Sequence, residues 1–159
     1  MYKGYGTVLI TGGIASGKTS FLKKYINEVI NDKNNLIYIF DSKTVEFVEY
    51  KNFDNVIYVD IANEFDDKVY NTIINDEDNS RKYLFIDEYS DVRLFEDLHK
   101  KVKYLMYNRD TLNLDVAIAS QDKTSFCNGM KANADMIVNI KRWRSNDKTT
   151  YKSFDSFFK

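Results

Sequence analysis

A glycine-rich stretch at residues 12–19 constrains the fold of this chain more than any other part of the sequence. It reads Gly-Gly-Ile-Ala-Ser-Gly-Lys-Thr and fits the pattern G-x-x-x-x-G-K-[ST]. An apolar run at residues 7–10 precedes it and predicts a short buried strand. The apolar residues that follow recur at the spacing of one helical face: Phe21, Leu22, Tyr25, Ile26, Val29 and Ile30. A loop between strand and helix with this pattern binds the phosphates of a nucleoside triphosphate.

Each residue type in this loop has a physical role. Glycines let the backbone curl so that successive N–H groups face a phosphate, and the helix that begins there adds the positive end of its dipole. Lys18 is expected to reach the β- and γ-phosphates of ATP, and the Thr19 hydroxyl is expected to ligate Mg²⁺. The predicted nucleotide-binding residues are Gly12, Gly13, Ile14, Ala15, Ser16, Gly17, Lys18, Thr19 and Ser20. A glycine-rich turn without a ligand is the alternative, and the strand-loop-helix context weighs against it.

Composition and charge exclude several classes of protein. The chain has 159 residues, 43% hydrophobic and 30% charged, which predicts one globular domain with a substantial core. The net charge of -1 is no signature of a general affinity for nucleic acid, so any basic surface must be local. Cys127 is the only cysteine, which excludes an internal disulfide and favours a reducing compartment. His99, the only histidine, lies among lysines and is predicted to be a solvated surface residue.

Membrane and export signals are missing from the sequence. No apolar run approaches the ~18 residues that a membrane helix needs, and no signal peptide precedes the first strand. The sequence therefore predicts a cytoplasmic protein without membrane insertion of its own.

Apolar runs and helical patterns alternate along the rest of the chain. Strands are predicted at residues 7–10, 36–41, 56–59, 82–88, 115–121 and 136–140. Helices are predicted after the glycine-rich loop and at residues 64–74, 92–108 and 125–134, with one or two helical turns at 44–50. The residues expected to face inward from the 92–108 helix are Leu94, Leu98, Val102, Leu105 and Met106. This alternation predicts an α/β fold, with a parallel sheet covered by helices on both faces.

The carboxyl ends of the predicted strands supply the other candidate site residues, because ligand-binding groups gather there in a parallel sheet. Asp41 follows one strand, and Ser120 and Gln121 end another. Asp87 and Glu88 end the apolar strand at residues 82–88, which is the Walker B arrangement. Asp87 is predicted to bind the Mg²⁺ that Thr19 also holds.

Glu88 and Gln121 are predicted to act in hydrolysis. Glu88 would orient and deprotonate the water that attacks the γ-phosphate, while Gln121 would hydrogen-bond that phosphate or the water. The alternative for both is a solvated polar residue at a strand end. An arginine finger cannot be chosen by spacing, and Arg109 is ranked first because it lies just before the 115–121 strand.

Four segments resemble, in the same order, motifs of the FtsK/HerA superfamily of DNA-pumping ATPases, in particular the FtsK/SpoIIIE motor core. Residues 9–19, 40–47, 84–91 and 119–121 resemble its Walker A, IDPKxVEL, VVVDEFADL and ATQ motifs. Lys131-Ala132-Asn133 matches its IKAN segment. The resemblance implies a RecA-like P-loop NTPase fold, a homo-oligomeric ring that is expected to be a hexamer, and ATP hydrolysis coupled to movement of double-stranded DNA.

Departures from the family pattern narrow this expectation. Asp122-Lys123 stands where the family has an Arg-Pro pair, and the chain has no membrane segment and no room for a winged helix. The resemblance therefore implies a minimal motor of viral or mobile-element type. Such a motor would act in the host cytoplasm or on the virion, with a membrane-associated or capsid partner.

The chain is predicted to divide into a RecA-like ATPase core at residues 1–140 and a tail at residues 141–159. The tail carries six basic residues against two acidic ones, interleaved with aromatic side chains: Lys141, Arg142, Arg144, Lys148, Lys152 and Lys159 against Asp147 and Asp155. This composition suits contact with the DNA backbone, and it equally suits a docking segment for a neighbouring subunit.

Two other functions remain open at this point. A nucleoside kinase can have this length, a phosphate loop and an acid at a strand end, although Glu88 and Gln121 suit water as the nucleophile. An ATP-binding assembly or morphogenesis subunit would use hydrolysis only to reset its shape.

Overall fold

Six parallel strands form a single sheet at the centre of the computed structural model, which describes residues 5–13, 16–42 and 45–140. The strands are β1 (Thr7–Thr11), β2 (Leu36–Phe40), β3 (Val56–Val59), β4 (Lys82–Ile86), β5 (Leu114–Ser120) and β6 (Met136–Asn139). Their order across the sheet is β3-β2-β4-β5-β1-β6. All six predicted strands are confirmed, and so is the α/β class, as a RecA-like P-loop NTPase fold.

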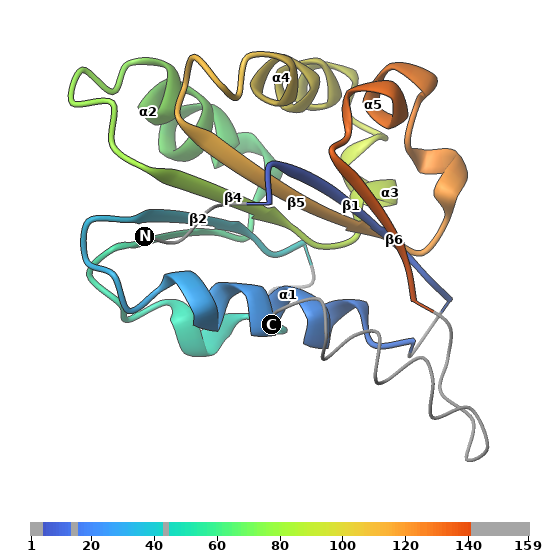
Figure 1. The fold of residues 1–159 in the computed structure, drawn as a ribbon, viewed down its shortest axis with the longest axis horizontal. Helices are drawn as coiled ribbons and strands as arrows, with labels where there is room; N and C mark the ends of the chain where they lie inside the picture. The colour runs from blue at the N-terminus through green and yellow to red at the C-terminus, as the bar shows by residue number, and fades with distance from the viewer. Residues whose placement is uncertain (1–4, 14–15, 43–44, 141–159) are drawn as a thin grey trace.

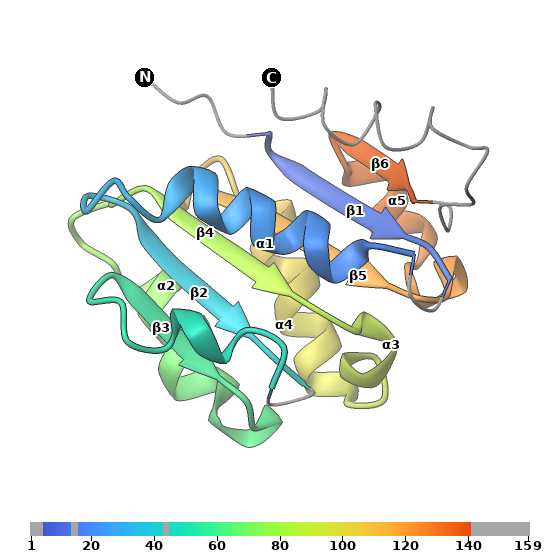
Figure 2. The ribbon, with the colours of Figure 1, turned by 90° about the horizontal axis from the view of Figure 1, so that it is seen from below.

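Helices cover both faces of the sheet (Figure 1). One face carries α1 (Lys18–Val29), which lies across the strands in the view from below (Figure 2). The other face carries α2 (Asn71–Ile74), α4 (Glu96–Tyr107) and α5 (Asn128–Asn133). The short helix α3 (Tyr89–Val92) follows β4 directly.

Alternate residues of each strand supply two separate cores, because successive side chains point to opposite faces of a sheet. In β1, Val8 and Ile10 pack on the α1 side, while Leu9 packs on the other. In β2, Ile37 and Ile39 likewise oppose Tyr38. The central strands are apolar on both faces, which is the burial expected of a parallel sheet.

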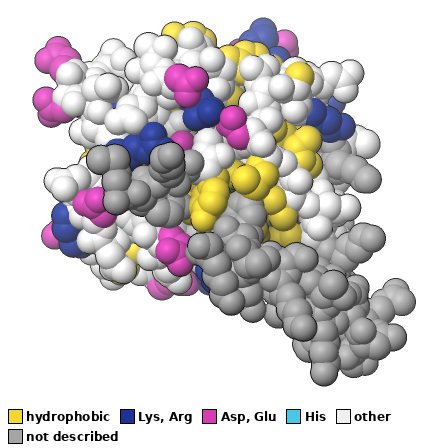
Figure 3. Space-filling model, viewed as in Figure 1, with side chains coloured by type: hydrophobic (Ala, Val, Ile, Leu, Met, Phe, Trp, Pro, Cys, Tyr) yellow, Lys and Arg dark blue, Asp and Glu magenta, His cyan; other side chains and the backbone are white. Residues whose placement is uncertain are grey.

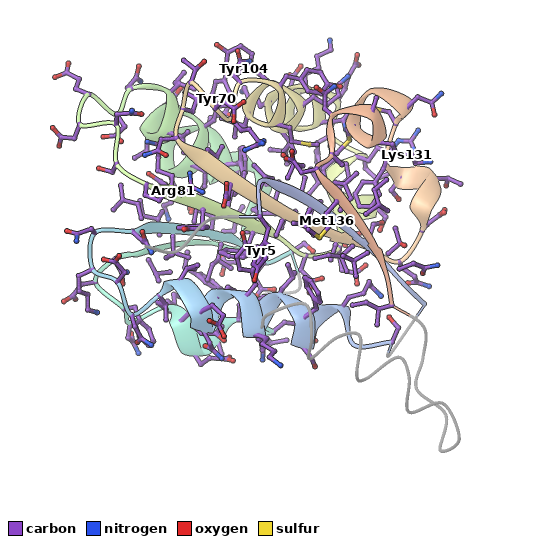
Figure 4. The ribbon with its side chains drawn as sticks, viewed as in Figure 1. Tyr5, Tyr70, Arg81, Tyr104, Lys131 and Met136 are labelled. Atoms are coloured by element: carbon purple, nitrogen blue, oxygen red, sulfur yellow. The ribbon has the colours of Figure 1, made fainter. Side chains whose placement is uncertain are left out.

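The predicted helix at residues 64–74 is present as three short pieces. A 3₁₀ turn (Ala62–Glu64) leads into a π-helix (Asp66–Tyr70) and then into α2. Tyr70 of the π-helix and Tyr104 of α4 meet edge to face, with 6.0 Å between ring centroids (Figure 4). The one or two helical turns predicted at residues 44–50 are present as a 3₁₀ helix (Val48–Tyr50). The helix predicted at residues 125–134 is present as α5, and another 3₁₀ helix (Lys123–Ser125) precedes it.

The predicted single helix at residues 92–108 is wrong. The chain breaks between α3 and α4, where Phe95 is extended with φ -102° and ψ 101°. Leu94 lies in this break and is 81% exposed, although it fits the apolar spacing of the helix that follows. The other four residues predicted to face inward are buried: Leu98, Val102, Leu105 and Met106.

The edge strand β6 leaves apolar surface near the start of the chain. Hydrophobic side chains gather on this face in Figure 3, and Figure 4 places Tyr5 and Met136 there. Both residues are partly buried against the α1-side core. None of the described helices is long and apolar enough to cross a bilayer.

We predict that Gly6→Ala destabilises the fold. Gly6 has φ +73°, and an added Cβ would lie 2.2 Å from Asp135 Oδ2, the atom that accepts the Thr7 N–H. Because both the backbone angle and the space forbid a side chain, the free energy of unfolding is expected to fall by about 2 kcal/mol. Urea unfolding measures this change. Gly13→Ala is the control, since an added Cβ there meets nothing within 4 Å, and a comparable loss in that variant would contradict the explanation.

Candidate functional site: a phosphate loop and two strand-end acids

Lys18 is held against the backbone of its own loop. Its Nζ donates hydrogen bonds to the carbonyl oxygens of Gly12 at 2.8 Å and Gly13 at 2.9 Å, and its side chain is buried. Gly17 precedes it with φ 107°, a left-handed conformation that L side chains rarely adopt. The backbone therefore turns sharply between β1 and α1, and Lys18 is the first residue of the helix.

Gly12 is required for a different reason, which is the closeness of two backbones. A Cβ at this position would lie 2.4 Å from the carbonyl oxygen of Ile140 and 2.4 Å from Ser16 Oγ. The loop thus packs directly against the end of β6, and no larger residue fits there.

Thr19 and Asp87 meet at the carboxyl edge of the sheet. Thr19 Oγ1 donates a hydrogen bond of 3.2 Å to Asp87 Oδ2. Asp87 is buried, and its Oδ1 accepts the N–H of Glu88 at 3.0 Å. The prediction that Asp87 lies beside Thr19 is in agreement with this geometry, which gives one hydroxyl and one carboxylate at the place where a cation would be needed.

The loop also fits a bound triphosphate by its hydrogen-bonding groups. Ser16 Oγ is buried and has no hydrogen-bond partner within the described part of the chain, a state that is costly unless a ligand supplies one. Lys18 holds its ammonium group on carbonyl oxygens that a phosphate can replace as acceptor. Ile14 and Ala15 lie outside the described residues. The described part of the loop therefore has donors that a phosphate would satisfy.

Mg²⁺ also fits this donor set. Among residues 5–13, 16–42 and 45–140, no group of three or more His, Cys, Asp or Glu residues could hold a metal ion by itself. Mg²⁺ does not need such a group, because it usually binds through one or two protein oxygens, water and substrate phosphates. Thr19 and Asp87 would be its protein ligands.

Glu88 has an unusual backbone conformation. Its φ of 54° and ψ of 59° are left-handed, which costs of order 1 kcal/mol for a residue that is not glycine. The next residue, Tyr89, is fully buried, and its ring stacks on Phe126 with 5.8 Å between centroids. The strained turn therefore positions Glu88 directly beyond Asp87 while its neighbour is fixed in the core.

His99 helps to hold this turn, so the prediction that it is a solvated surface residue is wrong. Its Nδ1 shares a hydrogen bond with the Tyr89 hydroxyl, and the ring is partly buried. Burial, together with the charges of Lys103 and Arg93, lowers the pKa of His99. Sequence periodicity could not reveal this contact, because it joins α4 to the segment after β4.

Gln121 follows β5, the strand that lies between β1 and β4. Its side chain is exposed at the same edge of the sheet as Thr19 and Asp87. Phe126 and Arg93 hold the segment after it, since the Arg93 guanidinium donates to the carbonyl of Thr124. Its contact with the γ-phosphate or the attacking water stays a prediction.

Asp41 lies at the same edge of the sheet, and its carboxylate binds other groups of the fold. Its Oδ2 accepts the N–H of Phe47 at 3.0 Å and the hydroxyl of Tyr58 at 2.6 Å. Burial and the contact with Asp41 raise the pKa of the Tyr58 hydroxyl. This carboxylate therefore ties Phe47 to the ends of β2 and β3.

Arg109 is not brought to this chain's own phosphate loop. It lies before β5, at the opposite, amino edge of the sheet, where it pairs with Asp135 at 2.9 Å and Asp110 at 3.2 Å. Asp115, which is 2% exposed, lies 3.9 Å from Arg109 and 2.6 Å from Arg81. Burial raises the pKa of Asp115 although these two arginines lower it. Arg109 thus serves an ion network, and its role toward another subunit stays a prediction.

The loop, the adjoining helix and the strand-end acid at one edge of a parallel sheet define a P-loop NTPase of the RecA-like type. The sequence profile of the AAA domain family matches residues 5–141. The chain therefore belongs to the AAA domain family. A comparison with curated proteins gave no match.

Solved structures with this fold include the cytoplasmic domain of EssC and a viral DNA-packaging ATPase. The cytoplasmic domain of EssC aligns with TM-score 0.70 and 14% identity, covering 92% of this chain and 33% of that chain. B204, the DNA-packaging ATPase from Sulfolobus turreted icosahedral virus, aligns with TM-score 0.69 and 18% identity, covering 98% and 84%. The genome packaging NTPase B204 of Sulfolobus turreted icosahedral virus 2, in complex with AMPPCP, gives 0.66 and 16%, covering 96% and 83%. This chain spans about a third of the EssC chain and most of B204.

We predict that Lys18→Met lowers the affinity for ATP at least about 100-fold, because the ammonium group would no longer face the phosphates. Titration with a fluorescent ATP analogue measures the dissociation constant. Lys24→Met, on the same helix, is the control and should bind as the unchanged protein does. If the Lys18→Met variant binds ATP as tightly as the unchanged protein, the assignment of this loop to the nucleotide site is contradicted.

Proposed function

We propose that this chain is a Mg²⁺-dependent ATPase of the FtsK/HerA type that works in a homo-oligomeric ring, as a hexamer, to move double-stranded DNA. The observation that carries the proposal is the contact of Thr19 with Asp87 beside the buried Lys18. It brings the phosphate loop and the Walker B acid together, and Glu88 follows them at once.

The residues of the chain divide the work of hydrolysis. Backbone N–H groups of residues 12–20 and the Lys18 ammonium would bind the phosphates, and Thr19 with Asp87 would hold Mg²⁺. When bound, the cation neutralises charge on the phosphate oxygens. The Glu88 carboxylate would orient a water molecule and accept its proton, and the Gln121 amide would hydrogen-bond the same water or the terminal phosphate. An arginine from a neighbouring subunit, for which Arg109 is the candidate, would complete the charge balance.

DNA as the partner is supported by three observations. The motif segments stand in FtsK/HerA order, and the segment at residues 131–133 adds a family-specific match. The chain is also similar over most of its length to B204, which is described as a DNA-packaging ATPase. We therefore favour a packaging or translocation motor of viral or mobile-element type, acting in the host cytoplasm or on the virion with a capsid or membrane-associated partner.

The tail at residues 141–159 lies outside the described residues, and its separation from a core at residues 1–140 stays part of the proposal. Its net positive charge suits either DNA or an acidic protein surface.

An assembly switch is the second candidate function. The structural similarity to the cytoplasmic domain of EssC, at TM-score 0.70, shows that this fold also occurs in a protein that is not described as a DNA-packaging ATPase. The arrangement of Lys18, Thr19 and Asp87 would serve a switch as well as a motor. A nucleoside kinase is less favoured, because Glu88 is placed beside Asp87 where a water molecule is activated rather than a nucleoside hydroxyl.

We expect Glu88→Gln to abolish ATP hydrolysis, with kcat at least about 100-fold lower, while ATP affinity stays within a few-fold. The amide keeps the size of the side chain and loses the proton acceptor. Steady-state ATPase assays and nucleotide titration measure the two quantities separately. Glu96→Gln, at the exposed first residue of α4, is the control. Undiminished hydrolysis in the Glu88→Gln variant would show that Glu88 is not the base.

We expect the ATPase rate per subunit to rise with protein concentration and again with linear duplex DNA. A ring completes each site with a residue from the neighbouring subunit, so isolated subunits should hydrolyse slowly. The assay compares dilute and concentrated protein with and without duplex DNA, and a parallel series tests free nucleosides. An ATPase rate that changes neither with protein concentration nor with duplex DNA favours the switch. A rate that rises only when free nucleosides are added favours the kinase.

A further inference from the structure

A hollow of about 300 Å³ lies beside the phosphate site, at the carboxyl ends of β2 and β3 and against α3. Figure 2 shows these two strands ending on the side where α3 lies. The residues that line the hollow are Phe40, Ser42, Asp60, Ala62, Asp91, Val92, Leu94 and Phe95. Neither the phosphate loop nor the strand-end acids of the nucleotide site take part in it.

The hollow is surrounded by apolar side chains that are left in water. Leu94 is 81% exposed, Phe95 is 55% exposed, and Ile61, next to Asp60 and Ala62, is 50% exposed. Leu94 and Phe95 lie beside the hollow because the chain is not helical between α3 and α4. Large apolar side chains exposed together around a concave surface mark a binding site rather than ordinary surface.

Two carboxylates give the hollow a negative charge. Asp60 follows β3, and Asp91 belongs to α3, where its Oδ2 accepts a long hydrogen bond of 3.5 Å from Ser42. None of the described lining residues is basic. A group that fills the hollow should therefore combine a large apolar body with positive charge on either side.

The sequence of this chain contains one segment with that chemistry. Arg142-Trp143-Arg144 places the only tryptophan of the chain between two guanidinium groups. Arginine pairs with carboxylates through two parallel N–H donors, and tryptophan is the side chain most often found as a buried anchor at interfaces. These residues lie outside the described part of the chain, so the match rests on their chemistry.

A second copy of the chain is the donor that fits the strand order. The segment starts after Ile140, at the end of β6, and the hollow is lined by the ends of β2 and β3 and by α3. Four strand spacings separate β6 from β2, about 19 Å, whereas three extended residues reach about 10 Å. The backbone of residues 141–143 is therefore too short to bring Trp143 of the same chain to β2.

We propose that the hollow of one subunit binds Arg142-Trp143-Arg144 of a second copy of this chain, with Trp143 against Leu94 and Phe95 and the arginines on Asp60 and Asp91. The donor segment follows β6 and the acceptor lies near β3, which are opposite edges of the sheet. A contact between two different surfaces leaves both free on the outer subunits, so copies add head to tail and can close into a ring. The binding does not depend on ATP hydrolysis.

Trp143 reports this contact directly, because no other tryptophan contributes to the fluorescence. The full chain is diluted from high to low micromolar concentration, and the tryptophan emission maximum is recorded with sedimentation equilibrium in parallel. The expected result is emission at shorter wavelength in the associated state and at longer wavelength after dissociation. An emission maximum that does not change with concentration overturns the proposal.

Charge reversal tests the acidic side of the hollow. Asp60→Lys with Asp91→Lys is expected to weaken self-association at least about tenfold, because like charges would then face each other. The matched control is Glu77→Lys with Asp78→Lys, two exposed acids in the loop before β4 that give the same change of net charge. An equal loss in the control would show a general charge effect and overturn the specific contact.

A charge swap separates a lost contact from a damaged fold. Arg142→Asp with Arg144→Asp should also dissociate the protein, and mixing this variant with the Asp60→Lys and Asp91→Lys variant should restore association between the two. Recovery of the short-wavelength emission in the mixture supports the proposal. Two variants that stay folded by circular dichroism and fail to associate with each other would overturn it.

Discussion

The hydrogen bond from Thr19 to Asp87 is the contact on which the site depends, because it joins residues 68 positions apart in the sequence. It forms because β1 and β4 both pair with β5 in parallel. Thr11 is level with Ser120, and Ile86 is level with Ile118, so the strands end within about two residues of one another. A slip of one residue in either pairing would turn the buried side chains to the wrong face, so the two apolar cores fix the register and the register fixes the site.

The segment after β4 holds Glu88 in a strained backbone conformation. Glu88 has a left-handed backbone conformation. The next residue, Tyr89, is held in the core by Phe126 and His99. Rigid packing around a strained residue lets a catalytic group keep one orientation without reorganising. The stacking of Tyr89 on Phe126 also connects the segment after Glu88 with the segment after Gln121, so the two polar strand ends share one packed cluster.

Much of the fold could be predicted from the sequence, because local patterns determine it. The six strands are continuous apolar runs, and the phosphate loop has a sequence whose glycines leave few other structures open. The identity of the strand-end residues followed from the rule that parallel strands end at one edge. The position of Asp87 beside Thr19 needed no information beyond that rule.

The predictions for Leu94 and His99 failed because contacts between distant segments determine these positions, and the place of Arg109 in the fold is set in the same way while its role toward another subunit stays untested. Leu94 matches the spacing of α4, and only the extended conformation of Phe95 separates it from the helix. His99 looks like one more polar residue in a basic helix until Tyr89 is placed beside it. Arg109 is close in sequence to β5 and lies at the far end of that strand from the nucleotide, because proximity to the start of a strand means distance from its end.

The packing of Gly12 on Ile140 has a mechanical consequence. The carbonyl of Thr11 accepts the N–H of Ile140 at 2.7 Å, and the glycine touches the same backbone, so the loop and the last described residue move as one joint. A displacement of the phosphate loop would therefore be transmitted to Ile140, so the end of the edge strand β6 is coupled to the loop that binds the phosphates.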